Sequence, residues 1–448
     1  MNARLARALW ALSVCGGLGG CAQTGALNFA EPSGTRLASS AAVVVPEGYI
    51  IRPLATGLRN PTGVTTDDLG NIYVTESASQ EPSRLLRVEP GGDTTVIAAG
   101  GEEPWQGLDY HDGAFVIAEG GVSDSGRILR IQPEASGATT SVLADGLPSF
   151  GGCRTNSPVV GPDGFVYFGR GNPGGRDMTQ SEANQRPRTE PGESGERELA
   201  GAYWLLGASD EPAQGNLPSV GAIMRVPASG GRVETVAWGL QNPFGLAFSN
   251  AGRLFVADAA CNVDANKPLL GAGDGVWRAL STEWPDGSAF QGGSLIAIAL
   301  PGAMLSPAAR SLPSPERFRV RAAASGIDFS RSEAFGFVDQ AFLVEFGDLT
   351  PVGGNMISPA GFKVIRIDPH TGELRDFATN ANFDLSQNGQ LRSSGGLERP
   401  IAVRFSRDGS ALYILDPGTS LEANSGGPGG VLWRVIRVGA AGTREARR

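Results

Sequence analysis

A short pattern of apolar and polar positions recurs six times along the chain, and each copy predicts a tight turn followed by a β-strand. Each copy begins with a turn that carries polar residues or Gly, continues as an apolar run, and usually ends at an acid. Apolar runs of this length between turn residues are typical of buried strands. The six copies occupy residues 69–76, 111–119, 162–170, 251–258, 339–345 and 408–416.

Further strands are expected on both sides of these copies. First strands precede them at residues 58–64, 105–110, 155–160, 240–248, 324–329 and 397–405. Third strands follow some of them at residues 84–88, 127–131, 222–226, 363–367 and 431–436. A repeat of about 40 residues or more that supplies a few strands each time indicates a β-propeller. We therefore predict an all-β, six-bladed β-propeller, a single closed domain with long loop insertions at residues 171–217 and 262–320.

Small residues in the first strands agree with this prediction. The first strand of a propeller blade lies innermost, and small side chains there allow the strands to crowd around the axis. Such residues are Gly63, Gly107, Gly245, Gly326 and Ala402. The chain of 448 residues contains 65 Gly and 30 Pro, a turn-rich composition that suits many short strands.

The charge of the chain argues against a nucleic-acid partner. The net charge is −9 and no long basic cluster is present. A nucleic-acid partner needs a basic stripe that neutralises phosphates. After the first twenty residues, no apolar stretch is long enough to span a bilayer.

The N-terminus has the pattern of a secretory signal. Arg4 and Arg7 precede an apolar run, and Leu18-Gly19-Gly20-Cys21 follows it. This ending looks like a bacterial lipobox, in which Cys21 is acylated; an ordinary signal peptide cut nearby is the alternative. We expect a lipoprotein-type signal peptide over residues 1–20, a flexible tether over 21–45, the propeller over 46–438 and a disordered tail over 439–448. The protein is then extracytoplasmic, either anchored in the periplasm through its lipid or secreted.

Polar residues are expected to converge at one end of the propeller, which we call the mouth. Residues before each first strand and after each second strand share this face. Those before the first strands are Arg59, Asn60, Gln106, Cys153, Asn156, Gln241, Asn242, Ser325, Glu398 and Arg399. Those after the second strands are Glu76, Glu119, Arg170, Asp258, Glu345 and Asp416.

Two interpretations of these acids remain open. Clustered oxygens suit a hard cation such as Ca²⁺, and Asn262, Asp264 and Asn266 follow Asp258 closely enough to add ligands. The structural interpretation is that strand-end acids cap loop amides or pair with nearby arginines. A site at the mouth is the default hypothesis for a propeller.

Histidine chemistry is not expected. The chain contains two His residues, His111 and His370, and both fall in turns away from the mouth. General-base catalysis would then fall to a carboxylate. No Ser-His-Asp set, phosphate-binding loop or dinucleotide fingerprint is placed credibly.

Four segments resemble the glucose/sorbosone dehydrogenase family. They are residues 238–248, 361–368, 411–418 and 430–434, and the likeness extends over roughly residues 50–437. The resemblance implies a secreted six-bladed propeller that holds pyrroloquinoline quinone (PQQ) with Ca²⁺ at its mouth and oxidises sugar hydroxyls. It implies cofactor-binding roles for Asn242, Gln241, Arg59 and Arg399, and metal-binding roles for Asp258, Asn262 and Asp264.

The chain departs from this family at the two most chemical positions. The catalytic His of the family falls at Cys153, so the catalytic residue is unknown. The Arg that polarises the quinone is replaced by the neutral Gln241, whereas Asn242 matches. These changes leave open that the chain binds neither PQQ nor Ca²⁺.

The same comparison bears on the cysteines. Cys153 and Cys261 are the two that remain after the signal, and an extracytoplasmic compartment favours disulfides. Both are expected at the mouth of adjacent blades, and we predict that they form a disulfide there.

The sequence leaves three candidate functions. The first is a PQQ-dependent sugar or alcohol dehydrogenase with a small-molecule sugar as substrate. The second is a non-catalytic, membrane-tethered propeller that binds carbohydrate or a protein. The third is a Ca²⁺-dependent, lactonase-like hydrolase. In each case we expect a monomer that contacts the membrane only through its N-terminal lipid.

Overall fold

The computed structural model describes fifteen stretches of the chain. They are residues 36–77, 81–101, 103–120, 126–147, 149, 155–171, 221–240, 242–258, 275–278, 294–298, 324–347, 361–371, 373–382, 395–418 and 429–438. Within them the regular structure is β-strand, apart from one 3₁₀ turn, η2 (Ser40–Ala42). In this part of the chain no helix is long and apolar enough to cross a membrane.

The described strands form six small sheets, which we number by the order of their inner strands. The first sheet contains β3 (Pro61–Thr66), β4 (Ile72–Glu76), β5 (Ser83–Val88) and β6 (Thr94–Gly100). The second contains β7 (Trp105–His111), β8 (Ala114–Glu119), β9 (Gly126–Glu134) and β10 (Gly137–Leu147). The third contains β11 (Thr155–Val160), β12 (Phe165–Arg170), β13 (Gly221–Pro227) and β14 (Glu234–Leu240).

The remaining three sheets include strands from both ends of the described chain. The fourth contains β15 (Pro243–Phe248), β16 (Leu254–Asp258), β18 (Ser294–Ile298) and β17 (Gly275–Arg278). The fifth contains β19 (Ala324–Phe329), β20 (Ala341–Glu345), β21 (Lys363–Ile367), β22 (Leu374–Asn380) and β1 (Val43–Val44). The sixth contains β23 (Ala402–Phe405), β24 (Ala411–Asp416), β25 (Gly430–Arg437) and β2 (Tyr49–Leu58).

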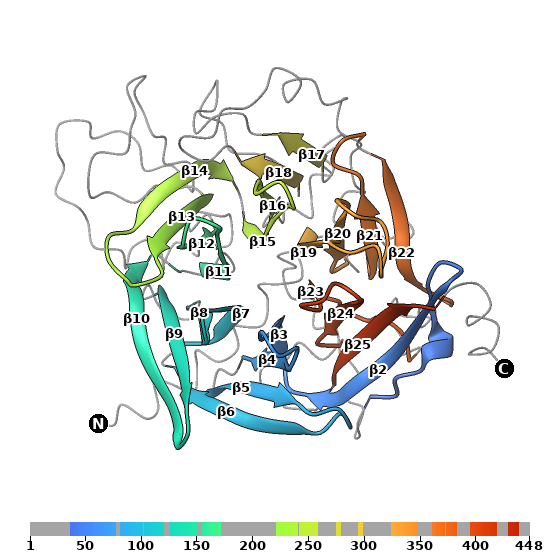
Figure 1. Cartoon of the computed structure of the whole chain (residues 1–448), viewed down its shortest axis with the longest axis horizontal. Helices are drawn as coiled ribbons and strands as arrows, with labels where there is room; N and C mark the ends of the chain where they lie inside the picture. Colours follow the sequence, from blue (N-terminus) through green and yellow to red (C-terminus); the bar gives the residue numbers. More distant parts are fainter. Residues whose placement is uncertain are drawn as a thin grey trace, which may run out of the picture.

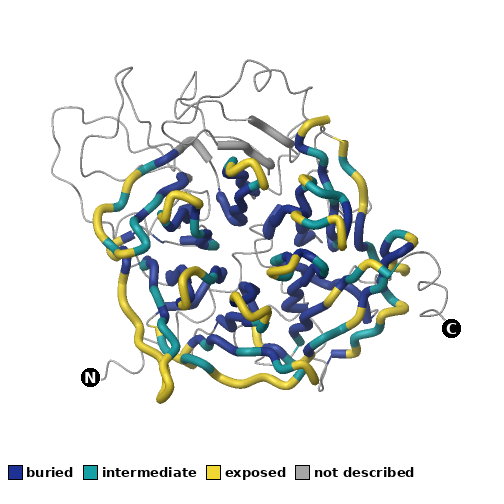
Figure 2. Tube along the Cα trace, in the orientation of Figure 1, coloured by how far each residue is buried: buried dark blue, intermediate teal, exposed yellow. Residues whose placement is uncertain are grey.

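The sheets are arranged around a common centre, with one inner strand from each sheet facing it (Figure 1). The expected all-β, propeller-like architecture is therefore confirmed, and so are the first, second and third strands that the repeated pattern predicts. The inner parts of the sheets are buried, and the exposed positions lie mostly on the outer strands and turns (Figure 2).

Two strands were not expected. β17 and β18 fall inside residues 262–320, where an irregular insertion is predicted, and β18 pairs antiparallel with β16. β17 then adds to β18 in parallel. The pairing has a physical reason, since an unpaired outer edge of β16 would leave a row of backbone groups without partners.

The ring is closed by joining its two ends. β2 pairs antiparallel with β25 from Tyr49–Arg437 to Leu58–Gly430, so the sixth sheet combines the beginning and the end of the described chain. β1 pairs with β22 through Val43–Asn380 and Val44–Thr379. Residues 36–45, which the sequence analysis assigns to a flexible tether, are thus packed against the sheets, because their apolar residues and Arg36 have partners far along the chain.

The small residues of the inner strands are placed as predicted. A Cβ atom added to Gly63 would lie 2.5 Å from the carbonyl carbon of Gly107, and one added to Gly107 would lie 2.5 Å from the Cα of Ser157. A Cβ on Gly326 would lie 2.5 Å from the Cα of Ala402. Contacts this short do not occur for real side chains, so neighbouring inner strands approach more closely than any larger residue allows.

Charged residues fix the inner strands at the end opposite the mouth. Asp109 and Asp328 occupy equivalent positions, each two residues after the inner-strand glycine. The carboxylate of Asp109 accepts a hydrogen bond from the backbone N–H of Val160, and that of Asp328 accepts one from Phe405, each at 2.8 Å. Each acid therefore joins its own sheet to the next one around the ring.

The Asp328 carboxylate is expected to make the stability of the protein pH-dependent. Burial acts to raise the pKa of Asp328, but Arg331, Arg404 and two backbone N–H groups outweigh it and lower the pKa below its ordinary value. A carboxyl group with a lowered pKa stabilises the folded state above the unfolded pKa, and this contribution is lost as pH falls through the folded pKa. Asp328→Asn should therefore cost stability near neutral pH and progressively less below about pH 4.

Urea unfolding of the wild type and Asp328→Asn at a series of pH values between neutral and acidic tests this expectation. The difference in unfolding free energy should be largest near pH 7 and should shrink on acidification. A difference that is the same at every pH would contradict the role assigned to the charge.

Candidate functional site

The strand-end acids lie at the mouth, where they bind groups of their own sheets. The Glu76 carboxylate accepts a hydrogen bond from the backbone N–H of Arg59 at 2.7 Å. The Asp258 carboxylate accepts one from the N–H of Asn242, also at 2.7 Å. These acids hold the residue that precedes an inner strand against the end of the neighbouring strand, as the structural interpretation expects.

A basic residue on the third strand completes the arrangement in three sheets. Arg84 lies across from Glu76, Arg127 from Glu119, and Lys363 from Glu345 in the strand register. The Nε of Arg84 lies 2.9 Å from Glu76, that of Arg127 2.7 Å from Glu119, and the Nζ of Lys363 3.7 Å from Glu345. The place of these bases at the first or second position of the third strand is the sequence signal that identifies the pairs.

Calcium binding by these acids finds no support in the described residues. Within them, no group of three or more His, Cys, Asp or Glu is arranged to hold a metal ion. Asp258, the expected metal ligand that the structure describes, is fully buried and already accepts the N–H of Asn242. The other two expected ligands, Asn262 and Asp264, lie outside the described residues.

Amides and hydroxyls at the start of the inner strands link adjacent sheets. The hydroxyl of Thr62 donates to the carbonyl of Trp105 in the next sheet at 3.0 Å. The Nδ2 of Asn156 donates to the Oδ1 of Asn242 at 2.7 Å and to the carbonyl of Pro243 at 3.3 Å. Asn242, the expected cofactor ligand that matches the resembled family, is therefore buried in a contact between the third and fourth sheets.

Three buried oxygens at the start of inner strands have no hydrogen-bond partner among the described residues. They are the Oε1 of Gln106, the Oγ1 of Thr155 and the Oγ of Ser325. Gln106 is the second residue of β7, Thr155 the first of β11, and Ser325 the second of β19. A buried polar atom without a partner is unfavourable by about 1–3 kcal/mol, so these three oxygens are candidates for contacts with a ligand.

The two expected cofactor-binding arginines have different surroundings. The side chain of Arg59 is about half exposed and pairs with Glu81 at 3.4 Å. Arg399 is buried, donates to the carbonyl of Gly347, and lies over the rings of Phe346 and Phe362 at 5.0 and 5.2 Å. No contact of the described residues brings Arg59, Arg399 and Asn242 together.

Several expected site residues lie outside the described residues. They are Cys153 at the catalytic position, Gln241, the proposed disulfide partner Cys261, and the lipidation site Cys21. The disulfide between Cys153 and Cys261 and the acylation of Cys21 therefore stay predictions.

The two expected arginines do not assemble a site for PQQ. This quinone carries several carboxylates and needs cationic partners that are free to meet them. Arg59 pairs with Glu81, and Arg399 is occupied by a carbonyl and two aromatic rings. We therefore derive no reaction step through PQQ from these groups.

The two histidines lie where the sequence predicts. His111 ends β7 on the side opposite the mouth and is exposed. His370 is exposed in a turn, where its backbone N–H donates to the Asp368 carboxylate at 2.8 Å. Neither is placed to act at the mouth.

No protein-family model and no curated protein sequence matches the chain. Solved structures do match it. A putative oxidoreductase (glucose dehydrogenase) from Thermus thermophilus is 15% identical, with 87% of this chain and 100% of that one covered at a TM-score of 0.51. The PQQ domain of pyranose dehydrogenase from Coprinopsis cinerea is 15% identical, with coverages of 89% and 98% and a TM-score of 0.54.

A carbohydrate-active enzyme of Trichoderma reesei, in its calcium structure, is 13% identical, with coverages of 90% and 99% and a TM-score of 0.52. In all three cases nearly the whole of the other chain is matched, so the likeness involves the complete propeller. At these identities the comparison shows a shared fold.

Proposed function

We propose that this chain is a six-bladed propeller of the PQQ-dependent glucose/sorbosone dehydrogenase type, and that its mouth binds a small molecule rich in hydroxyl groups, of the sugar class. The observation that carries the proposal is the set of buried, unpartnered oxygens of Gln106, Thr155 and Ser325. They begin the inner strands of three different sheets. Sugar hydroxyls both donate and accept hydrogen bonds, so such a ligand supplies the partners that these oxygens lack.

The likeness to sugar dehydrogenases supports the same class of ligand. One matched structure is named as a PQQ domain and another as a calcium structure, so PQQ and Ca²⁺ are the cofactors to test first. Two residues argue against turnover. Cys153 occupies the position of the catalytic base in the resembled family, and Gln241 occupies the position of its quinone-polarising Arg. Binding of a sugar and its oxidation are therefore separate parts of the proposal.

One experiment separates the three candidate functions. The mature protein is titrated with PQQ in the presence of Ca²⁺, and binding is followed by absorbance while dye reduction is measured across a panel of sugars. Stoichiometric PQQ binding with dye reduction supports a dehydrogenase. Sugar binding without either supports a non-catalytic carbohydrate-binding propeller. Hydrolysis of sugar lactones that disappears with a Ca²⁺ chelator supports a lactonase-like enzyme, and no binding of any sugar would overturn the proposal.

Replacing Gln106 by Met tests the binding site directly. Met has a similar shape and carries no oxygen to leave unpaired, so Gln106→Met should change the stability of the free protein by less than about 1 kcal/mol. The variant should bind the sugar about tenfold more weakly, because one hydrogen bond to the ligand is lost. A bound sugar should therefore raise the melting temperature of the variant less than that of the wild type. Thermal unfolding with and without sugar measures both quantities.

Gln132→Met is the matched control for this variant. Gln132 lies on the outer part of the second sheet, where its Nε2 donates to the carbonyl of Gly113. The Gln132→Met variant should leave sugar binding unchanged. If Gln106→Met retains full affinity, the ligand does not use this oxygen and the site lies elsewhere.

The location of the protein is also part of the proposal. We propose an extracytoplasmic monomer with a Cys153–Cys261 disulfide, anchored in the periplasm through a lipid on Cys21 or secreted. Mass spectrometry of the mature protein checks all three features: a diacylglycerol on Cys21, the disulfide-linked peptide pair, and the mass of a monomer under native conditions. Free thiols at Cys153 and Cys261 in the mature protein would remove the disulfide from the proposal.

A further inference from the structure

The first residue that the structure describes is a buried arginine. The Nε of Arg36 lies 3.1 Å from the Glu398 carboxylate, and its Nη2 lies 3.0 Å from the Asp416 carboxylate. The guanidinium also donates to the carbonyls of Gly396 and, at 3.4 Å, Gly429. Both acids are almost completely buried, with exposed side-chain fractions of 3% for Glu398 and 0% for Asp416.

Comparison with three other sheets shows which position Arg36 takes. Glu76, Glu119 and Glu345 end their strands opposite a basic residue of the same sheet. Asp416 ends β24 in the same way, but the residue opposite it on β25 is Val431. Arg36 thus supplies from outside the sheet the cation that Arg84 or Arg127 supplies from within.

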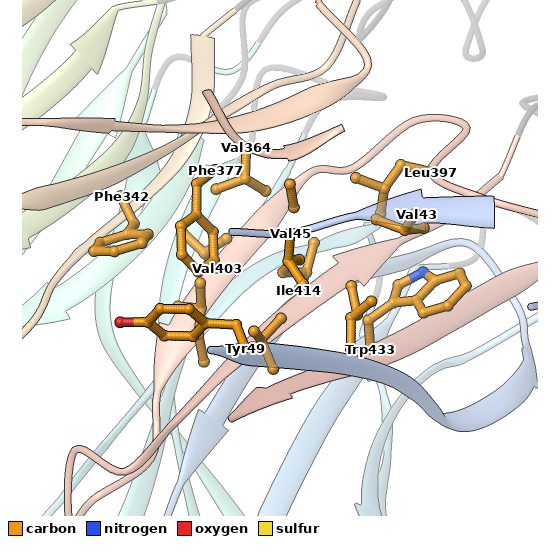
Figure 3. Close-up of a cluster of buried hydrophobic side chains, with 14 of the residues drawn as sticks. Val43, Val45, Tyr49, Phe342, Val364, Phe377, Leu397, Val403, Ile414 and Trp433 are labelled. Atoms are coloured by element: carbon orange, nitrogen blue, oxygen red, sulfur yellow. The ribbon is translucent and has the colours of Figure 1, made fainter. Parts of the chain in front are cut away.

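The residues that follow Arg36 hold it in place. The N–H of Ser39 donates to the carbonyl of Gly395 at 2.8 Å, and the N–H of Ala381 donates to the carbonyl of Ala42 at 2.9 Å. β1 then extends the fifth sheet. Val43 and Val45 pack into the hydrophobic cluster that contains Tyr49 and Trp433, on the fifth and sixth sheets (Figure 3).

The charges around Arg36 favour the cationic form of its side chain. Burial acts to lower the pKa of the Arg36 guanidinium, but Asp416 and Glu398 outweigh it and raise the pKa above its ordinary value. Removing one partner of a buried ion pair leaves the other charge uncompensated, which is far more costly than losing a surface pair. A shortened side chain at position 36 would leave two buried carboxylates beside an empty space of guanidinium shape.

We propose that Glu398, Asp416 and the carbonyls of Gly396 and Gly429 form a guanidinium-binding socket, and that residues 36–45 are a clasp that fills this socket with Arg36. The same Asp416 carboxylate accepts the backbone N–H groups of Glu398, Arg399 and Gly418 at 2.7, 2.9 and 2.9 Å. An occupied socket therefore holds the loop that begins the inner strand of the sixth sheet, at the mouth. Free guanidinium takes the place of the side chain when Arg36 is removed.

Chemical rescue of Arg36→Ala tests the socket in the full mature chain. The variant should melt about 5 °C or more below the wild type, because the two acids lose their cation. Guanidinium chloride at about 10 mM, far below denaturing concentrations, should restore most of the loss through binding to the folded state. Hydrogen exchange should rise in residues 39–45 and 378–381 of the variant and return toward the wild-type rate with guanidinium.

Three controls make the result specific. Ethylammonium chloride at the same concentration supplies a charge without the planar fork and should rescue less, and Arg36→Lys should likewise fall between Arg36→Ala and the wild type. Arg52→Ala removes an exposed arginine of β2 and should be neither destabilised nor rescued. If Arg36→Ala is too unstable to purify, the yields of refolded protein with and without guanidinium give the same comparison. Equal melting of Arg36→Ala and wild type, or an equal guanidinium effect on Arg36→Ala and Arg52→Ala, would overturn the socket.

Discussion

Replacing Gly245 by Ala is expected to prevent the fourth and fifth sheets from packing at their native distance. The added Cβ would lie 2.0 Å from the carbonyl oxygen of Ser325, 3.0 Å from its carbonyl carbon and 3.2 Å from the Cα of Gly326. All three are backbone atoms, so no side-chain rotation relieves the contact. Because the ring is closed, the strand cannot move away without opening another junction. The loss should be at least about 3 kcal/mol of unfolding free energy, at the upper end for overpacking.

Urea unfolding followed by tryptophan fluorescence measures this loss, and Gly91→Ala is its matched control. A Cβ on Gly91 would meet nothing within 4 Å, and Gly91 is not among the glycines with positive φ. The control variant should be within about 0.5 kcal/mol of the wild type or slightly more stable. If both variants unfold at the same urea concentration, the close approach of the inner strands is not what fixes the ring.

These glycines show what a sequence of this kind predicts well. Strand positions follow from apolar runs between turns, and those are local properties of the chain. The inner-strand glycines recur at one position of the repeat, so their role follows from the repeat itself. Gly63, Gly107, Gly245 and Gly326 are all found where a larger residue does not fit.

Contacts between distant parts of the chain were not predictable in this way. Arg36 and Asp416 are separated by 380 residues, and nothing near either of them in the sequence points to the other. Residues 36–45 end a longer stretch, 21–45, whose many small and polar residues favour a tether, yet Val43 and Val45 at its end pack into a hydrophobic cluster of the propeller. Composition indicates whether a segment can form a hydrophobic core by itself. Whether the segment packs in the folded protein also depends on the apolar surfaces of the other elements.

The strand-end acids were predicted in position but not in role. Acids at strand ends suit a cation site and a network of caps equally well, because both need carboxylate oxygens at a turn. Only the distances separate the two, and those of Glu76 and Asp258 favour capping of Arg59 and Asn242. The unpaired oxygens of Gln106 and Ser325 had no sequence signal beyond their place in the repeat.

Replacing Arg404 by Met is expected to loosen three sheets at once. Arg404 extends from β23 to the carbonyl of Val64 at 3.5 Å and that of Leu108 at 3.2 Å, and it pairs with Asp109 at 3.4 Å. It thereby joins the sixth sheet to the first and second. The side chains of Arg404 and Asp109 are only 18% and 12% exposed, so solvent screens the pair weakly. Met keeps the bulk of the side chain and removes the charge, and we expect a loss of about 2–4 kcal/mol.

A double-mutant cycle with Asp109→Asn separates the ion pair from the rest of this contact. Asn keeps an oxygen that accepts the N–H of Val160, so the single variant isolates the loss of charge. If the pair matters, Arg404→Met should cost less by about 1 kcal/mol or more when Asp109 is already Asn. Arg407→Met is the matched control, because its ion pair with Asp68 at 2.9 Å is more than half exposed and should contribute about 0–1 kcal/mol. Equal losses from Arg404→Met and Arg407→Met would mean that the ring is held by its glycine contacts and its β2–β25 closure, without help from charges near the axis.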